Sequence, residues 1–356
     1  MRNLREDSST RLGPRGFSMI ELLVSISIIS VLMALVLPAI NNARGSARRI
    51  QCANRLRNIT VAMCSYADTN RRYPASGYWK RDSSGSTFPN HNWVVDLLAF
   101  VDRRDLADRW DKDRPLADNS QLAQIQIPVL RCPADITANG QGDLSYAVNG
   151  GIGFTMRVGA VHDCPVDPFG NLLDLDGNGM AGILPETAAG DRVFFKRLGL
   201  FFMENWQTPN GVVRHHSPNS VSDGLSNTVM ILESVRTGYD PVEPSASWAT
   251  ADPRRAAVYF SHRICPSGTC SVSDVDYSMA NSGNHGINEA LTQAEGEAPW
   301  ASSFHSGGTN VAFADGRVQY LDERVDGRVY ASLFSAQGRS LIGTPLNQGV
   351  VSDDEF

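Results

Sequence analysis

Residues 16–40 read GFSMIELLVSISIISVLMALVLPAI, and this stretch decides how the N-terminal part of the chain folds. From Phe17 to Ile40 it is apolar, apart from Glu21 and small hydroxyl side chains. As an α-helix, these 24 residues would be about 36 Å long, enough to cross a hydrocarbon core of about 30 Å with some tilt. The run is too long for the apolar core of a cleaved secretory signal. The sequence therefore predicts a membrane-spanning helix.

The charged residues around this run point to function but do not set its orientation. Residues 1–16 are polar and contain four arginines, while five more follow between Arg44 and Arg57. Because both flanks are basic, the positive-inside rule does not decide which end faces the cytoplasm. Glu21 lies near one end of the apolar run, where a carboxylate is unfavourable unless it finds a partner. We therefore take Glu21 as a functional candidate.

The string GFSMIE at residues 16–21 resembles the cleavage and methylation motif of type IV prepilins. The resemblance implies that a prepilin peptidase removes leader 1–16 by cutting after Gly16 at the cytoplasmic face, and that the new amino group of Phe17 is methylated. Glu21 would then neutralise the amino terminus of a neighbouring subunit, which avoids burying either charge alone. An ordinary single-span anchor would leave the Gly-Phe junction and the Glu spacing unexplained.

The helix is expected to continue beyond the apolar run. In residues 41–72 the apolar side chains recur at spacings of three and four, which predicts an amphipathic helix with one face on its own domain. Segments 17–40 and 41–72 together predict one element from about Ser18 to Asp68, bent near Pro38.

The remainder, residues 73–356, is expected to form an exported, β-rich globular head. Its short apolar runs are separated by turn residues, and the whole chain has 31 Gly, 18 Pro and 42% hydrophobic residues. Strands are predicted at 128–130, 143–148 and 229–232, and a further helix at 94–110. The fold class is α+β: a long pilin-type helix packed on an antiparallel β-sheet head with long loops.

Six cysteines permit three disulfides in an exported head. Cys265 and Cys270 enclose four residues, and we expect a small cross-linked loop there. Cys52 and Cys64 cannot pair within one helix, because twelve residues at helical rise separate them by about 18 Å.

Several strings along the chain resemble a large family of prepilin-like proteins of unassigned role, expanded in planctomycete bacteria. That family ends in a His-x9-Asp-Gly motif, which His305, Asp315 and Gly316 match. The resemblance also implies a second disulfide between Cys52 and Cys132, since both fall on motif positions. The other matching strings lie at 49–73, 93–106, 131–135, 145–149 and 222–233.

A calcium loop is the candidate cofactor site. Asp174, Asp176 and Asn178 alternate as the oxygen ligands of a calcium loop do, with Gly residues to permit the turn. A complete EF-hand would carry Glu at its twelfth position, but Pro185 stands there and Glu186 comes one residue late. A plain Asx turn is the alternative, and no other cofactor is expected.

His305 and Asp315 could be a base and its orienting group, but Asp315-Gly316 between two apolar runs is typical of a hairpin turn. No nucleophile or metal-protease motif accompanies them, so we expect no enzyme. The formal net charge of −6, without a basic stripe, argues against nucleic-acid binding.

These observations predict a type IV pilin or pseudopilin-like subunit. It would sit in the inner membrane with a single pass and an exported C-terminal head, and then assemble into a surface filament or secretion pseudopilus. The expected partners are a prepilin peptidase, other pilin-like subunits and membrane lipid. The alternative is a membrane-anchored periplasmic or surface protein that uses the pilin-type signal only for export and binds a ligand with its head.

Overall fold

The computed structural model describes residues 18–81, 87–158, 162–179, 185–205, 215–235, 237–238, 246–265, 270 and 275–348. The leader, Gly16 and Phe17 therefore lie outside the described residues. The chain divides into two compact units, 1–47 and 48–356. Each unit is described by itself.

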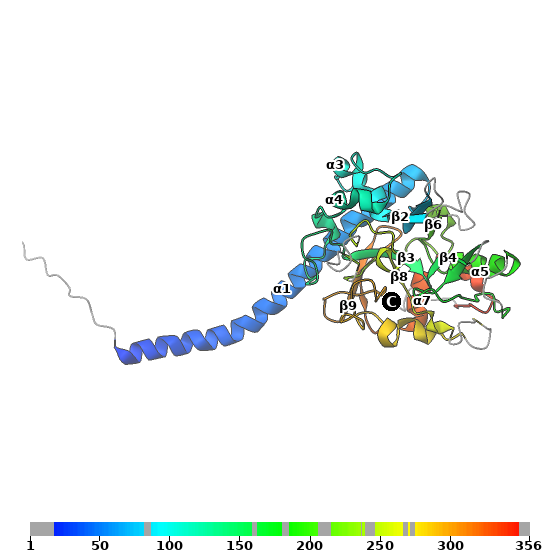
Figure 1. Cartoon of the computed structure of the whole chain (residues 1–356). Coiled ribbons are helices and arrows are strands. Elements are labelled where there is room, and N and C mark those ends of the chain that lie inside the picture. Colours follow the sequence, from blue (N-terminus) through cyan, green and yellow to red (C-terminus); the bar gives the residue numbers. More distant parts are fainter. Residues whose placement is uncertain are drawn as a thin grey trace, which may run out of the picture. The chain divides into compact units, whose positions relative to one another are not determined.

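Helix α1 (Met19–Asn70) confirms the predicted long N-terminal helix and contains Pro38 (Figure 1). It begins with a reciprocal cap: the Ser18 hydroxyl accepts from the Glu21 backbone N–H at 3.3 Å, and the Glu21 carboxylate accepts from the Ser18 N–H at 2.9 Å. This capping box satisfies backbone donors that the first helical turn leaves without partners. Within unit 1, large apolar side chains are exposed around the helix, and this is the one described helix long and apolar enough to span a membrane.

In unit 2, the rest of α1 has one buried face, as the spacing of its apolar residues predicts. Cys52, Leu56, Ile59 and Met63 are fully buried in the head. Arg55 and Arg57 point away from that core and stay partly or fully exposed. The second half of α1 is thus part of the head.

A central five-stranded sheet organises the head, in the order β10-β9-β7-β3-β8. Its pairings are antiparallel except between β3 and β8, which run parallel. The strands are β3 (Tyr146–Gly151), β7 (Val229–Glu233), β8 (Ala257–Tyr259), β9 (Gly308–Phe313) and β10 (Val318–Asp322).

Smaller elements surround this sheet. A three-stranded sheet has the order β2-β1-β6, and β4 pairs with β5 as a hairpin. These strands are β1 (Gly77–Arg81), β2 (Thr87–Asn92), β4 (Phe154–Val158), β5 (His162–Val166) and β6 (Met203–Asn205). The other α-helices are α2 (Trp93–Leu97), α3 (Arg104–Ala107), α4 (Ser120–Ala123), α5 (Pro185–Arg197), α6 (Pro253–Ala256) and α7 (Gly327–Phe334).

Both faces of the central sheet are buried, which explains why β7 reads as a continuous apolar run. Alternate side chains of β3 enter two different cores: Tyr146 and Val148 pack with α1, whereas Ala147 packs with α7. The sheet is therefore a middle layer between α1 with the small helices on one side and α7 on the other.

Two local predictions were wrong. The helix expected at 94–110 is broken into α2, a 3-10 turn at Leu98–Phe100 and α3, because Asp102 adopts φ 58° between them. The strand expected at 128–130 is a 3-10 turn, Pro128–Leu130, whose proline suits a helical first position. The strand at 229–232 is confirmed as β7, and the one at 143–148 begins later, at Tyr146.

Candidate functional site

Two residues of the closing motif form a turn. Strands β9 and β10 pair in antiparallel register, and Asp315 and Gly316 connect them. The Asp315 carboxylate accepts a hydrogen bond from the Arg317 N–H at 2.9 Å, and Gly316 takes φ 94°. Asp315 is exposed, whereas His305 is buried and has Glu233 and Cys132 as its neighbours. The dyad of His305 and Asp315 is therefore not formed, and the hairpin alternative is correct.

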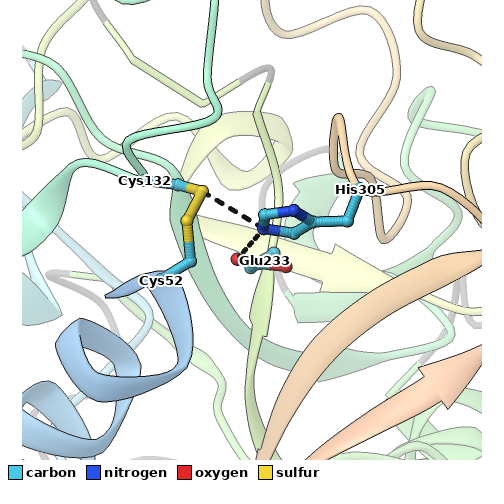
Figure 2. A group of neighbouring side chains, drawn as sticks. All are labelled: Cys52, Cys132, Glu233 and His305. Atoms are coloured by element: carbon cyan, nitrogen blue, oxygen red, sulfur yellow. Dashed lines mark hydrogen bonds and ion pairs between the residues drawn. A yellow bond between two sulfur atoms is a disulfide. The ribbon is translucent and has the colours of Figure 1, made fainter. Parts of the chain in front are cut away.

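His305 lies instead in a buried group with Glu233 and the Cys52–Cys132 disulfide (Figure 2). Its Nε2 is 3.4 Å from Glu233 Oε1 and 3.5 Å from Cys132 Sγ. Cys52, Cys132 and Glu233 have no exposed surface, and the His305 side chain is only 4% exposed. The disulfide itself, with Cα atoms 4.9 Å apart, confirms the pairing that the family resemblance implies.

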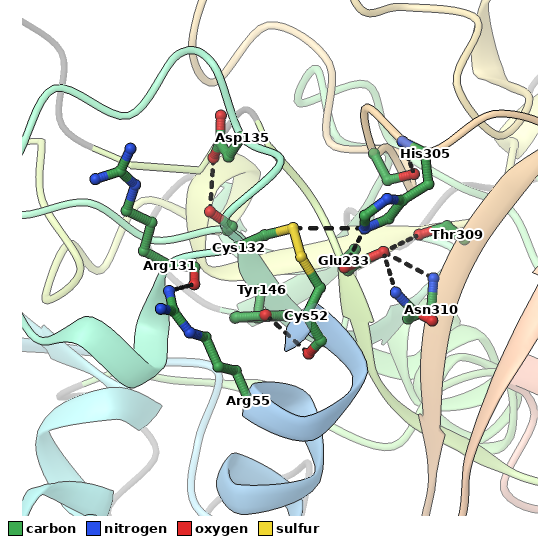
Figure 3. The surroundings of a disulfide bond; sticks show 12 residues. Cys52, Arg55, Arg131, Cys132, Asp135, Tyr146, Glu233, His305, Thr309 and Asn310 are labelled. Carbon is green, nitrogen blue, oxygen red and sulfur yellow. Dashed lines mark hydrogen bonds and ion pairs between the residues drawn. A yellow bond between two sulfur atoms is a disulfide. The ribbon is translucent and has the colours of Figure 1, made fainter. Parts of the chain in front are cut away.

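Strand register brings these residues together. Leu232 pairs with Val311 across β7 and β9, which places Glu233 beside Asn310. Glu233 Oε2 accepts from the Asn310 backbone at 2.8 Å and from the Asn310 side chain at 3.1 Å (Figure 3). The backbone carbonyl of Glu233 accepts from the Ser302 N–H at 3.0 Å, and His305 follows three residues later.

The disulfide side of the group is held by its own contacts. The Tyr146 hydroxyl donates to the Cys52 carbonyl at 3.1 Å, and Arg55 donates to the Arg131 carbonyl at 2.6 Å (Figure 3). Burial, followed by the nearby Glu233 carboxylate, raises the pKa of Tyr146 well above its usual value, so this hydroxyl stays a donor. The turn after Cys132 is fixed by Asp135, which accepts from Ser145 at 2.6 Å.

This arrangement unites motifs that are far apart in the sequence. Cys52, Cys132, Glu233 and His305 each come from a different string that resembles the prepilin-like family. Sequence reasoning chose His305 and the cysteines but missed Glu233. Glu233 could have been found from its position, because it is a single carboxylate at the end of the apolar run VMIL. A carboxylate buried there would require a partner. The group is enclosed, so it suits binding or structural chemistry better than turnover of an external substrate.

The predicted calcium loop also gathers carboxylates. Oxygens of Asp174, Asp176 and Asp191 lie within 4.8 Å of one another, and Asp174 and Asp191 are buried. Asp191 lies on α5 and was not predicted. The predicted ligand Asn178 is not part of this group of carboxylates. Its side-chain amide donates a hydrogen bond to Asp176 at 2.9 Å. Burial, and then the adjacent Asp174 carboxylate, raise the pKa of Asp176, whereas its hydrogen bonds with Asn178 oppose that rise.

The same loop satisfies its own polar groups. Asp174 accepts from the N–H groups of Gly177 and Gly179 at 2.9 and 2.7 Å, and Asp191 accepts from Leu175 at 2.7 Å. The Asp174 contacts are those of an Asx-type turn, whereas Asp191 reaches the loop from α5. Calcium binding therefore stays a prediction from the sequence.

The other predicted disulfide, Cys265–Cys270, is also present, with Cα atoms 4.8 Å apart. The four residues between these cysteines lie outside the described part of the chain. Cys265 and Cys270 are both buried against the core that contains α7. The bond therefore belongs to the other core, on the opposite side of the central sheet from Cys52.

Comparison with known families agrees with both resemblances. Residues 41–328 match a family described as a protein of unknown function (DUF1559), and residues 12–37 match the prokaryotic N-terminal methylation motif. No curated protein and no solved structure matches the chain. The methylation motif implies processing by a prepilin peptidase, and with the apolar helix it indicates a membrane-anchored, exported protein. The chain thus belongs to the DUF1559 family and is a type IV prepilin-like protein.

Proposed function

We propose that the processed protein is a pilin or pseudopilin-like subunit, stored in the inner membrane and then assembled into a surface filament or secretion pseudopilus. The observation that carries this proposal is the first half of α1. Its large apolar side chains at residues 19–40 are between 41% and 87% exposed. Each gains about 1.5–3 kcal/mol on leaving water, so the segment requires lipid or other apolar helices around it.

The polar groups of this segment are suited to an apolar environment. The hydroxyls of Ser25, Ser27 and Ser30 donate to carbonyls of the same helix at 2.7, 2.8 and 2.8 Å. Such bonds remove unsatisfied donors from a span that has no water. Glu21 is the one carboxylate in the described part of this span. It could offer its charge to the methylated amine of a neighbouring Phe17.

The head supports a role in assembly rather than catalysis. Its most conspicuous polar group, His305 with Glu233, is buried beside a disulfide. The Asp315 turn is a connection between strands. The proposed activity is therefore polymerisation through α1, with the head displayed by the filament.

A substitution at Glu21 and a control substitution at Ser25 test the proposal. Glu21→Gln keeps the capping box, because Gln at this place also bonds back to the cap, but removes the charge. Ser25→Ala is the control, since it changes the same apolar surface without a charge. We expect wild type and Ser25→Ala to yield filaments that an antibody against the head labels in electron micrographs of sheared surface material. Glu21→Gln should accumulate in the membrane with labelled filaments reduced at least tenfold.

Other outcomes would overturn the proposal. Normal filaments from Glu21→Gln would show that no intersubunit charge pair is needed. Absence of the wild-type head from every filament, with the protein held in the membrane, would favour the anchored ligand-binding protein instead.

A further inference from the structure

The buried group of Cys52, Cys132, Glu233 and His305 contains the donor set of a zinc site. One ligand atom from each residue lies within 4.8 Å of the others. We propose that, when the Cys52–Cys132 disulfide is reduced, these four side chains bind one Zn²⁺, so that disulfide and zinc are alternative occupants of the same place. Two thiolates, an imidazole and a carboxylate are ligands that Zn²⁺ accepts in tetrahedral geometry.

The distances already fit two edges of such a tetrahedron. With Zn–N and Zn–O bonds of about 2.0–2.1 Å and Zn–S bonds of about 2.3 Å, ligand atoms are separated by about 3.3–3.8 Å. His305 Nε2 lies 3.5 Å from Cys132 Sγ and 3.4 Å from Glu233 Oε1 (Figure 2). The two sulfur atoms must move apart, which the breaking of their mutual bond permits, and the remaining ligand atoms lie within 4.8 Å of one another.

An unsatisfied atom independently points to a ligand. Glu233 is fully buried, and its Oε1, directed at His305, has no hydrogen-bond partner. A buried carboxylate oxygen without a hydrogen bond is unfavourable by roughly 1–3 kcal/mol or more. The other oxygen, Oε2, is fixed by Asn310, as carboxylate ligands of metals usually are. Oε1 makes no hydrogen bond and lies 3.4 Å from His305 Nε2, so this oxygen faces the position that a cation would share with the imidazole.

The chemistry balances with a dithiol reductant. The reductant gives two electrons and two protons to the sulfur pair, the bond between Cys52 and Cys132 breaks, and the reductant becomes a disulfide. Zn²⁺ then replaces the two thiol protons, which are released to solvent. Two thiolates and Glu233 bring three negative charges against two positive charges of the ion, and neutral His305 adds none. The metal-bound thiolates cannot re-form the disulfide until zinc leaves.

Cobalt binding to the full-length protein tests this proposal. The Cys265→Ser/Cys270→Ser background removes the other disulfide, and a phosphine reductant avoids dithiols that chelate metal. We expect reduced protein to bind one Co²⁺ with thiolate charge-transfer and intense visible bands of tetrahedral cobalt, and Zn²⁺ to displace it. Oxidised protein should show neither band. Because the carboxylates of the 174–191 region are the same in both forms, this comparison also excludes them as the source of the bands.

His305→Gln and Glu233→Gln in the same background should each weaken cobalt binding at least tenfold and alter the visible bands. Circular dichroism of each oxidised variant checks that the head still folds. If reduction unfolds the head without metal, refolding on addition of Zn²⁺ supports the site, and failure to refold overturns it. A folded reduced head without the charge-transfer band, or cobalt affinity unchanged in both variants, also overturns it.

Discussion

Removing each disulfide separately should destabilise the head by different amounts. Cys52 and Cys132 are 80 residues apart in the sequence, whereas Cys265 and Cys270 are 5 apart. In the chain-entropy description, a crosslink stabilises the fold by restricting the unfolded chain, and the effect grows with the logarithm of the closed loop. That relation gives about 4.5 kcal/mol for the long loop and about 2 kcal/mol for the short one. The difference should therefore be about 2.5 kcal/mol.

The assay is urea unfolding of Cys52→Ser/Cys132→Ser and Cys265→Ser/Cys270→Ser, each in detergent beside the wild type. Buried tryptophans, among them Trp93 and Trp248, provide a fluorescence signal for the head. We expect the free energy of unfolding to fall about twice as far in the first variant as in the second. Equal losses, or a larger loss in the second variant, would refute the reasoning from loop length.

Three further predictions concern charge, processing and metal. Burial alone would raise the pKa of Asp96, but the His91 imidazole, whose Nε2 is 3.8 Å from the Asp96 carboxylate, and the charge of Lys112 lower it from 3.8 to about 2. The ionised form therefore stabilises the fold above pH 4, and roughly 2 kcal/mol of stability should be lost as pH falls from 4 to 2. Asp96→Asn should abolish this part of the pH dependence of the urea midpoint, and an unchanged profile would contradict it. Mass spectrometry of membrane-derived protein should find N-methylated Phe17 as the first residue, and a start at Met1 would rule out processing. Calorimetry should detect heat from millimolar Ca²⁺ that Asp176→Asn removes, and no heat with wild type would end the calcium prediction.

Local sequence patterns predicted α1 well, because the residues that determine this helix lie within it. The apolar run and the three-and-four spacing after residue 41 both act over a few positions. The cap that Ser18 and Glu21 form at the helix start was not predicted. The same approach failed at 94–110, where apolar spacing continued but the backbone at Asp102 turned. Periodicity reports which side chains are buried and does not report a single residue with positive φ.

The candidate site was predictable only in part, because its contacts connect distant segments. Glu233 and His305 lie at the ends of different segments, and the pairing of β7 with β9 determines which carboxylate reaches the histidine. The sequence offered Asp315 as a partner because it is the nearest motif carboxylate in the chain. Likewise, Asp191 approaches Asp174 only because α5 packs beside the loop. Neither the pairing of Glu233 with His305 nor that of Asp191 with Asp174 produces a pattern among neighbouring residues of the sequence.

The position of the Cys52–Cys132 bond affects how force on the N-terminal helix is transmitted to the head. Helix α1 is continuous from Met19 to Asn70, so any load on its apolar part reaches the head through the residues after 47. Cys52 lies at the start of that stretch, and Arg49 stacks its guanidinium 4.7 Å from the Tyr320 ring on β10. The disulfide joins this stretch of α1 to Cys132, which follows the 3-10 turn Pro128–Leu130, and the Arg49 contact joins it to β10. The noncovalent contacts of a helix face can separate one turn at a time. A covalent bond at Cys52 must instead bear a force on the helix or break. Reduction of this one bond would therefore both free the proposed zinc ligands and remove the covalent link between α1 and the segment that contains Cys132.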